Sequence, residues 1–217
     1  MDVRAFVFDV DGVLTDTVEP HYQSWVRLGR EERIELAPDF KDQMRGLTRP
    51  MSLRLFLGRR ETPEEVAQDY LRRKNDYFLE SLGQLSAQDL LPGVRALLEA
   101  LSAAGIPIAI GSASKNAREV VRRLGVDRFI AAYADGHSVE RSKPAPDVFL
   151  EAARLIEVDP SGCVVVEDAE VGIEAAHAAG MRAIGVGPRG RLAAADLVVD
   201  TLEGLTLAQI QASLAKR

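Results

Sequence analysis

Helical and strand patterns alternate along the chain from residue 93 to its C-terminal end. The strand patterns cover residues 106–111, 129–132, 163–167, 182–186 and 197–199. The helical patterns around them cover residues 93–104, 114–124, 146–157, 170–179 and 206–215. Such alternation predicts an α/β fold, in which a Rossmann-like parallel sheet is covered by helices on both faces.

The N-terminal part of the chain is organised differently. An apolar run over residues 3–8 predicts one further buried strand. Only helical patterns follow it, at about 20–31, 50–57 and 62–82, the last starting with Thr62 as its capping residue. We therefore expect a helical cap domain inserted after the first strand. Its expected range is 17–88, and the expected core domain comprises 1–16 and 89–217.

Two acids stand where the first strand pattern stops. Asp9 and Asp11 are separated by one residue, so strand alternation places both on one side, and Gly12 lets the chain turn after them. Carboxylates this close repel each other unless a cation neutralises them or one keeps a proton. Acids that merely cap the next helix are one alternative. A calcium loop fails as another, because its twelfth position is Pro20 rather than glutamate.

Further polar residues follow other strand patterns, at the edge where open α/β sheets carry their sites. Ser112 and the free N–H groups after it would bind an anion, or Ser112 is an ordinary helix cap. Lys143 lies in a loop stiffened by two prolines and is either a fixed active-site ammonium or a surface lysine. Glu167 and Asp168 form a second carboxylate pair, and two facing pairs suit an octahedral Mg²⁺ site.

The run from Asp9 to Thr17 resembles motif I of the haloacid dehalogenase superfamily of phosphotransferases, and the other motifs follow in order. The resemblance implies that Asp9 attacks phosphorus to form an aspartyl phosphate, while Asp11 acts as general acid and base. Ser112 matches motif II and Lys143 matches motif III. By the same resemblance, the Mg²⁺ cofactor is held by Asp9, the backbone carbonyl of Asp11, and Asp168, with Glu167 close by or binding through water.

Within that superfamily, segments of the expected cap are similar to those of hexose-phosphate mutases. The implied substrate-binding residues are Thr17, His21, Trp25, Gly46, Leu47, Arg49, Lys74, Ala113, Ser114, Lys115 and Asn116. The similarity implies that Arg49 binds the phosphate that is not being transferred. It also implies that Thr17 and His21 position Asp11 when the cap closes. Taken singly, Arg49 and Lys74 could be solvated helix residues and His21 a surface histidine.

The resemblance implies a mutase that interconverts β-D-glucose 1-phosphate and glucose 6-phosphate through an aspartyl phosphate and glucose 1,6-bisphosphate. One alternative is a Mg²⁺-dependent phosphatase acting on sugar phosphates or phosphoglycolate. Another is a binding protein without activity, which the presence of every catalytic carboxylate disfavours. The expected partner is a small hexose phosphate.

Composition excludes several other classes of partner. The net charge is −6 and no block of five like charges occurs, which argues against nucleic-acid binding. The single cysteine, Cys163, lies in an apolar run and reads as a buried structural thiol. Neither a signal-peptide pattern nor a stretch of eighteen apolar residues is present, so we expect a cytoplasmic protein that does not contact a membrane. No coiled-coil pattern is visible, and we expect a monomer.

Overall fold

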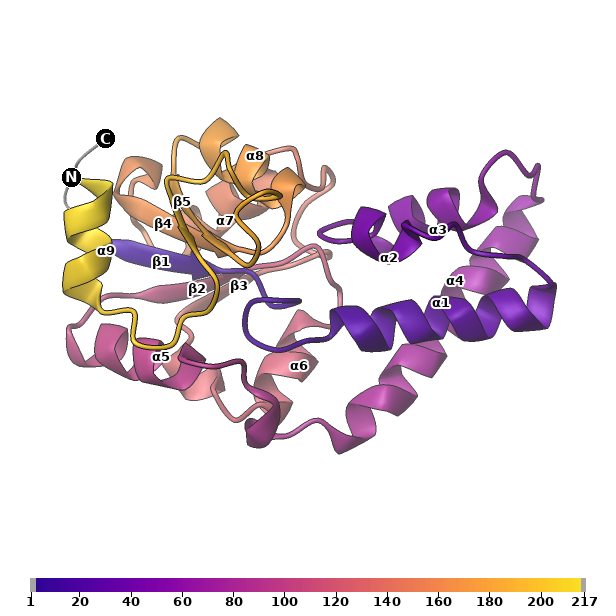
Figure 1. Cartoon of the computed structure of the whole chain (residues 1–217), viewed down its shortest axis with the longest axis horizontal. Coiled ribbons are helices and arrows are strands. Elements are labelled where there is room, and N and C mark those ends of the chain that lie inside the picture. The colour runs from indigo at the N-terminus through magenta and orange to yellow at the C-terminus, as the bar shows by residue number, and fades with distance from the viewer. Residues whose placement is uncertain (1–2, 216–217) are drawn as a thin grey trace.

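A six-stranded parallel sheet forms the centre of the protein in the computed structural model, which describes residues 3–215 (Figure 1). The strands are β1 (Ala5–Phe8), β2 (Ile108–Gly111), β3 (Ala132–Ala134), β4 (Cys163–Glu167), β5 (Arg182–Val186) and β6 (Leu197–Val199). Their order across the sheet is β3-β2-β1-β4-β5-β6. β1 therefore lies between β2 and β4, and the residues after these three strands meet at one edge.

Helices cover both faces of the sheet, as the alternating pattern predicts. They are α5 (Val94–Ala103), α6 (Ala117–Arg123), α7 (Asp147–Leu155), α8 (Glu170–Ala178) and α9 (Leu207–Leu214). Phe6 and Phe8 of β1 pack with α5, α6 and α9, while Ala5 and Val7 pack on the other face with α7 and α8. Both faces of β1 are thus buried, which explains its continuous apolar run. The predicted α/β fold class is confirmed.

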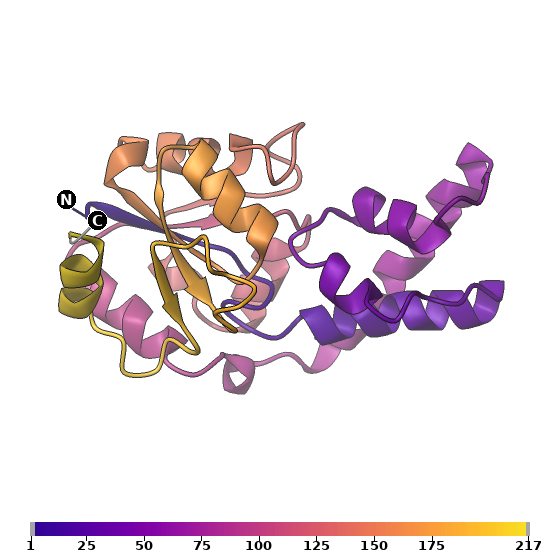
Figure 2. The same cartoon turned by 45° about the horizontal axis from the view of Figure 1, so that its top comes forward.

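Four helices between β1 and α5 form a separate lobe, visible in both views (Figures 1 and 2). They are α1 (Val18–Glu32), α2 (Phe40–Gln43), α3 (Arg49–Leu57) and α4 (Glu64–Ser81). This lobe has its own apolar cluster, in which Trp25 contacts the rings of Phe40 and Phe56 at centroid distances of 6.1 and 5.1 Å. The lobe thus has an apolar core of its own, while Phe78 of α4 packs into the cluster on one face of the sheet.

The two chain segments that join the lobe to the sheet lie side by side. Thr15 forms an isolated antiparallel bridge with Leu90, and its hydroxyl donates a hydrogen bond to the carbonyl of Asp89 at 2.7 Å. The short 3₁₀ turns Leu82–Gln84 and Ala87–Asp89 complete the return path. The lobe is thus attached close to Asp11, which forms a bridge with Thr15.

Several elements differ from the sequence prediction. The short strand expected at 129–132 lies at Ala132–Ala134, because Asp127–Phe129 forms a 3₁₀ turn. α2 was not predicted, since four residues are too few for a periodic pattern. α4 begins at Glu64 with Pro63 as its N-cap, one residue later than the expected capping by Thr62. Within residues 3–215, no helix combines the length and the apolar character needed to cross a bilayer.

The helix expected from residue 114 begins at Ala117, which changes the interpretation of the serines before it. The hydroxyl of Ser112 accepts the N–H of Ser114 at 3.1 Å, and the hydroxyl of Ser114 accepts the N–H of Asn116 at 3.2 Å. These bonds hold two successive turns instead of a helical start. Ser112 therefore caps a turn after β2 and does not cap α6.

Candidate active site

Asp9 is fixed at the end of the central strand and shares a buried ammonium with a second acid. Its N–H donates to the carbonyl of Val166 at 3.0 Å, and its side chain is nearly inaccessible. Lys143 Nζ lies 2.8 Å from both Asp9 Oδ1 and Glu167 Oε2. Burial acts to lower the pKa of Lys143, but the two carboxylates outweigh it and raise the pKa above its ordinary value. Lys143 is thus a charged, fully buried residue, and the surface-lysine alternative is wrong.

Three carboxylates gather around this ammonium. Oxygens of Asp9, Glu167 and Asp168 all lie within 4.8 Å of one another, and all three residues are buried. Burial raises the pKa of Glu167 to about 8, with Lys143 opposing the shift. Burial and the charge of Asp9 raise the pKa of Asp168 to about 6. The cations among the described residues therefore do not neutralise all of the negative charge that these three carboxylates can carry. A donor set made only of oxygens fits a hard divalent cation.

Two glycines make room for these acids. A Cβ on Gly12, whose φ is +88°, would lie 2.2 Å from Asp168 Oδ2. A Cβ on Gly172 would lie 2.1 Å from the carboxyl carbon of Glu167. Glu167 Oε1 also accepts the N–H groups of Asp168 and Ala169 at 3.1 Å each, so both of its oxygens have protein partners. Asp9 and Asp168 consequently keep more free ligand capacity than Glu167 does.

Asp11 is held by residues from the start of the helical lobe. The hydroxyl of Thr17 donates a hydrogen bond to Asp11 Oδ1, and His21 Nε2 lies 3.8 Å from the same oxygen. Burial, reinforced by the Asp9 charge, raises the pKa of Asp11 to about 7. A carboxyl with this pKa can either donate or accept a proton near neutral pH.

His21 is fixed between an aromatic ring and an ammonium. Its ring stacks on Phe78 at a centroid distance of 3.7 Å and an angle of 6°, and its Nδ1 contacts Lys74 Nζ. Burial, with the charges of Lys74 and Arg49, lowers the pKa of His21 well below its ordinary value. A neutral ring that accepts from Lys74 at Nδ1 carries its proton on Nε2, which faces Asp11. The surface-histidine alternative is therefore wrong.

Two cations lie on the lobe's side of the site. Lys74 is only 2% exposed, so it is not on a solvated helix face. Burial and the charge of Arg49 lower the pKa of Lys74 to about 7. Arg49 opens α3, and burial lowers its pKa as well, with Asp76 opposing the shift. Within the described chain, no carboxylate lies close enough to form an ion pair with Arg49. Arg49 is thus a partly buried charge available to an anionic ligand.

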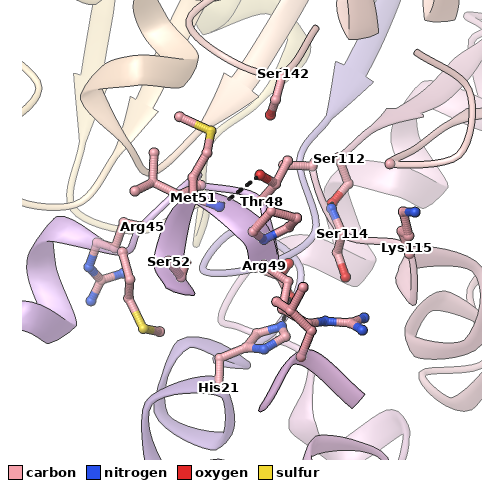
Figure 3. Close-up of a pocket in the computed structure, with 18 of the residues that line it drawn as sticks. His21, Arg45, Thr48, Arg49, Met51, Ser52, Ser112, Ser114, Lys115 and Ser142 are labelled. Atoms are coloured by element: carbon pink, nitrogen blue, oxygen red, sulfur yellow. Dashed lines mark hydrogen bonds and ion pairs between the residues drawn. The ribbon is translucent and has the colours of Figure 1, made fainter. Parts of the chain in front are cut away.

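A cavity of about 790 Å³ lies between the sheet edge and the helical lobe. The predicted residues that line it are Asp9, Asp11, His21, Trp25, Gly46, Leu47, Arg49, Lys74, Ser112, Ala113, Ser114 and Lys115. Figure 3 shows His21 and Arg49 from the lobe across the cavity from Ser112, Ser114 and Lys115. The cavity is therefore lined from both lobes, with Asp9 and Asp11 on the core side and Arg49 and Lys74 on the side of the helical lobe.

Five predicted residues are not part of the cavity lining. Four of them contact or adjoin the acids of the cavity. Lys143 contacts Asp9, Glu167 and Asp168 belong to the same carboxylate cluster, and Thr17 donates a hydrogen bond to Asp11. The fifth, Asn116, donates from Nδ2 to Asn75 Oδ1 at 3.0 Å, which links the core to α4. Asn116 thus connects the two lobes instead of facing the cavity.

Sequence analysis missed two residues of the site. Arg45 Nη1 lies 2.6 Å from Asp168 Oδ2, although the two residues are 123 positions apart. Ser142 lines the cavity, and its buried hydroxyl has no hydrogen-bond partner within residues 3–215. Only the position of Ser142 beside Lys143 could have drawn attention to it. No local signal marks Arg45, because its partner lies on the other lobe.

The sheet, the buried acids with their lysine and the covering lobe define the class of phosphotransfer enzymes with a capped α/β core. Residues 3–180 match the family described as haloacid dehalogenase-like hydrolase, so the chain belongs to this family, as its motifs predicted. The beta-phosphoglucomutase of Bacillus subtilis (strain 168) is 38% identical over 209 residues, which cover 94% of this chain and 92% of that protein.

One solved structure and a second relative are similar to this chain over nearly its whole length. The crystal structure of beta-phosphoglucomutase from Clostridium difficile superposes with a TM-score of 0.94 at 34% identity, covering 99% of this chain and 98% of that one. Hexitol phosphatase A of Escherichia coli (strain K12) is 33% identical over 219 residues, or 95% of each protein. The chain is therefore an enzyme of the phosphotransferase and mutase type, and it is similar both to beta-phosphoglucomutases and to a hexitol phosphatase.

Proposed function

We propose that this enzyme acts as a β-phosphoglucomutase, interconverting β-D-glucose 1-phosphate and glucose 6-phosphate through glucose 1,6-bisphosphate. The observation that carries the proposal is the distribution of cations at the cavity. Lys143 lies beside Asp9 in the core, and Arg49 and Lys74 line the cavity from the helical lobe. A sugar carrying a phosphate on each side needs positive charge at both ends, whereas a monophosphate needs it only near the nucleophile. The similarity to two beta-phosphoglucomutases supports the same conclusion.

The first step of the proposed mechanism is attack of Asp9 on phosphorus. Lys143 occupies Asp9 Oδ1, so the other carboxylate oxygen is the one available to form the bond. The acylphosphate that results places three charged oxygens next to the Lys143 ammonium, which stabilises them. The hydroxyls of Ser112 and the unpartnered Ser142 are positioned at the cavity to donate to these oxygens.

Asp11 moves the proton in each half-reaction. Its raised pKa gives a protonated fraction that can supply the leaving sugar oxygen, and the resulting carboxylate can then take the proton of the attacking hydroxyl. Thr17 and His21 both contact this carboxylate from the lobe's first residues. We infer that Asp11 is aligned for this exchange when residues 17–88, acting as the cap domain, are closed.

The donor set suggests the metal of the reaction. Asp9, Asp168 and the backbone carbonyl of Asp11 would hold Mg²⁺, with Glu167 adjacent to them. The bound ion would neutralise charge on the transferring phosphoryl group. Apart from the metal, Lys143 already supplies one fixed positive charge at this place.

Arg49 would bind the phosphate that is not being transferred, which a mutase needs in both half-reactions. After transfer, the bisphosphate has to present its other phosphate to Asp9, so each phosphate must in turn be gripped at the far end. A planar guanidinium binds a phosphate through two parallel hydrogen bonds in either orientation of the sugar. Closure of the cap would meanwhile exclude water from the aspartyl phosphate and favour transfer to sugar over hydrolysis.

A phosphatase acting on phosphorylated sugars is the competing function, because hexitol phosphatase A covers the same length of chain. The two functions differ in the fate of the phosphoryl group. We would incubate the enzyme with β-glucose 1-phosphate, Mg²⁺ and glucose 1,6-bisphosphate, and measure glucose 6-phosphate and free phosphate together. Glucose 6-phosphate in excess supports the mutase. Free phosphate formed in step with substrate loss contradicts it, and the Asp9→Asn variant serves as the inactive control.

A further inference from the structure

A loop of the helical lobe rests directly on the residues that follow Asp168. Gly46, with a φ of +70°, lies so close that an added Cβ would be 2.8 Å from Val171 Cγ2 and 3.1 Å from Ala169 Cβ. A residue with a side chain would be strained in this conformation and would push the loop away. The glycine therefore allows the preceding residue, Arg45, to reach the carboxylate cluster.

Arg45 makes a strong contact at the end of that loop. Its Nη1 lies 2.6 Å from Asp168 Oδ2, and the two side chains are 19% and 4% exposed. Asp168 is confined on another side by Gly12, which leaves no room for a Cβ. A charge pair so little exposed to water is screened weakly, so the guanidinium supplies much of the positive charge that Asp168 receives.

The other contacts of Arg45 are weak. Its Nε lies 3.7 Å from Asp42 Oδ1, too far for a hydrogen bond, and this buried nitrogen has no hydrogen-bond partner in the described part of the chain. Asp42 is 71% exposed and also faces Arg191 Nη1 at 3.8 Å. Arg45 is consequently held mainly by Asp168, and it can leave without breaking other well-formed bonds.

We propose that the guanidinium of Arg45, which belongs to the cap, acts as a counter-cation at the metal site. A divalent cation that binds Asp168 must compete with this guanidinium for the carboxylate. The inference rests on the metal site of the proposed function. A guanidinium 2.6 Å from one oxygen of Asp168 repels a dication bound to the same carboxylate. Metal binding therefore weakens the contact between the cap loop and the core, and by thermodynamic reciprocity that contact weakens metal binding.

The test compares Arg45→Met with a matched control, Arg59→Met. Methionine keeps an unbranched side chain and removes the charge, and Arg59 is an exposed arginine of the same lobe that does not line the cavity. We would titrate each substrate-free protein with Mg²⁺ by calorimetry. We expect Arg45→Met to bind Mg²⁺ about tenfold more tightly than the wild type, within the usual range of coupling between two sites. Arg59→Met should match the wild type.

A second readout follows the position of the cap. Small-angle scattering of the metal-free proteins should give a larger radius of gyration for Arg45→Met, and adding Mg²⁺ should expand the wild type but not this variant. Circular dichroism checks that each variant is folded. Unchanged or weaker Mg²⁺ binding by folded Arg45→Met overturns the inference, and so does the absence of Mg²⁺ binding by every protein.

The product assay for the proposed function is scored separately from this titration. If the wild type releases free phosphate instead of glucose 6-phosphate, the mutase proposal fails. Tighter Mg²⁺ binding by Arg45→Met would still support the role of Arg45, because a phosphatase of this family would use the same carboxylates.

Discussion

Lys143 Nζ lies 2.8 Å from Asp9 Oδ1, although the two residues are 134 positions apart and both side chains are almost wholly buried. The same ammonium lies 2.8 Å from Glu167 Oε2, so it bridges the carboxyl ends of β1 and β4. This bridge places one ammonium between two buried carboxyl groups next to the cavity. Because a buried charge is stable only when it is paired, the geometry of Asp9 depends on Lys143 as much as on the strand that carries it.

Replacing Asp9 by asparagine should abolish turnover while preserving the fold. The amide is a far poorer nucleophile, and we expect the rate to fall by several orders of magnitude, the scale of covalent-residue deletions. Lys143 retains Glu167 as a partner, so thermal unfolding should stay close to that of the wild type. Product formation by purified Asp9→Asn measures the effect, and substantial residual turnover would overturn the assignment of Asp9.

Replacing Asp11 by asparagine should separate proton transfer from metal binding. The variant cannot donate or accept the proton, and we expect a loss of roughly a hundredfold or more in kcat. Its proposed metal ligand is the backbone carbonyl, so Mg²⁺ affinity should change little. Steady-state kinetics and a Mg²⁺ titration of the same preparation test both statements. A collapse in Mg²⁺ affinity with normal residual chemistry would mean that the two roles are wrongly assigned.

Replacing Arg49 by alanine should change the ratio of products. Without its guanidinium the cap loses its grip on the phosphate that is not transferred, and more phosphoenzyme is lost to water. Isomerisation should slow while the ratio of free phosphate to glucose 6-phosphate rises. Arg49→Lys should rescue the ratio only in part, since an ammonium lacks the planar bidentate fork. If Arg49→Ala keeps both its rate and its product ratio, the mutase proposal is wrong and the phosphatase function takes its place.

Replacing Gly12 by alanine should damage the metal site and the fold together. The added Cβ would lie 2.2 Å from Asp168 Oδ2 at a residue whose φ is +88°. Gly105→Ala is a matched control, because Gly105 has a φ of +70° but no heavy atom within 4 Å of the added Cβ. We expect the control to lose about 1 kcal/mol of unfolding free energy from backbone strain. Gly12→Ala should lose clearly more in denaturant titrations and bind Mg²⁺ more weakly, and equal losses would contradict the close packing.

Stabilisation by Mg²⁺ should increase with pH. The folded pKa of Glu167 is raised from 4.5 to about 8, and that of Asp168 from 3.8 to about 6. A carboxyl of this kind stabilises the fold below its unfolded pKa, and the contribution is lost as pH rises through the folded pKa. A cation bound by the charged forms restores it. The rise in Tm caused by Mg²⁺ over EDTA should therefore be larger at about pH 8 than at about pH 5.5, where protons still compete for these groups.

Comparing the Mg²⁺ and EDTA samples at each pH removes the effect of groups outside the cluster. Lys74, for example, has a lowered pKa and titrates in the same range, but it contributes to both samples. Differential scanning calorimetry gives the two Tm values directly. A Mg²⁺-induced shift that is the same at both pH values would show that these carboxylates do not hold the metal.

Much of the core was predictable because its signals are local. The apolar run before Asp9 and the one before Glu167 each predict a buried strand, and each stops where its acid begins. Parallel strands bring such residues to one edge, so the meeting of Asp9 and Glu167 follows from the strand pattern. Lys143 reaches them from the loop between β3 and α7, and the strand pattern does not specify its position. β3 was misplaced because Phe129 and Ile130 are apolar, yet the chain turns there before it joins the sheet.

The sequence by itself determined the α/β fold class, the family and the acids at the strand ends, because short-range periodicity and turn chemistry encode them. Only the tertiary structure decided that Arg45 pairs with Asp168, that Asn116 pairs with Asn75 and that His21 lies between Phe78 and Asp11. Each of these contacts joins residues brought together by the folding of the lobe or by its docking on the core. Their partners depend on how whole helices pack, and no spacing in the chain specifies that packing.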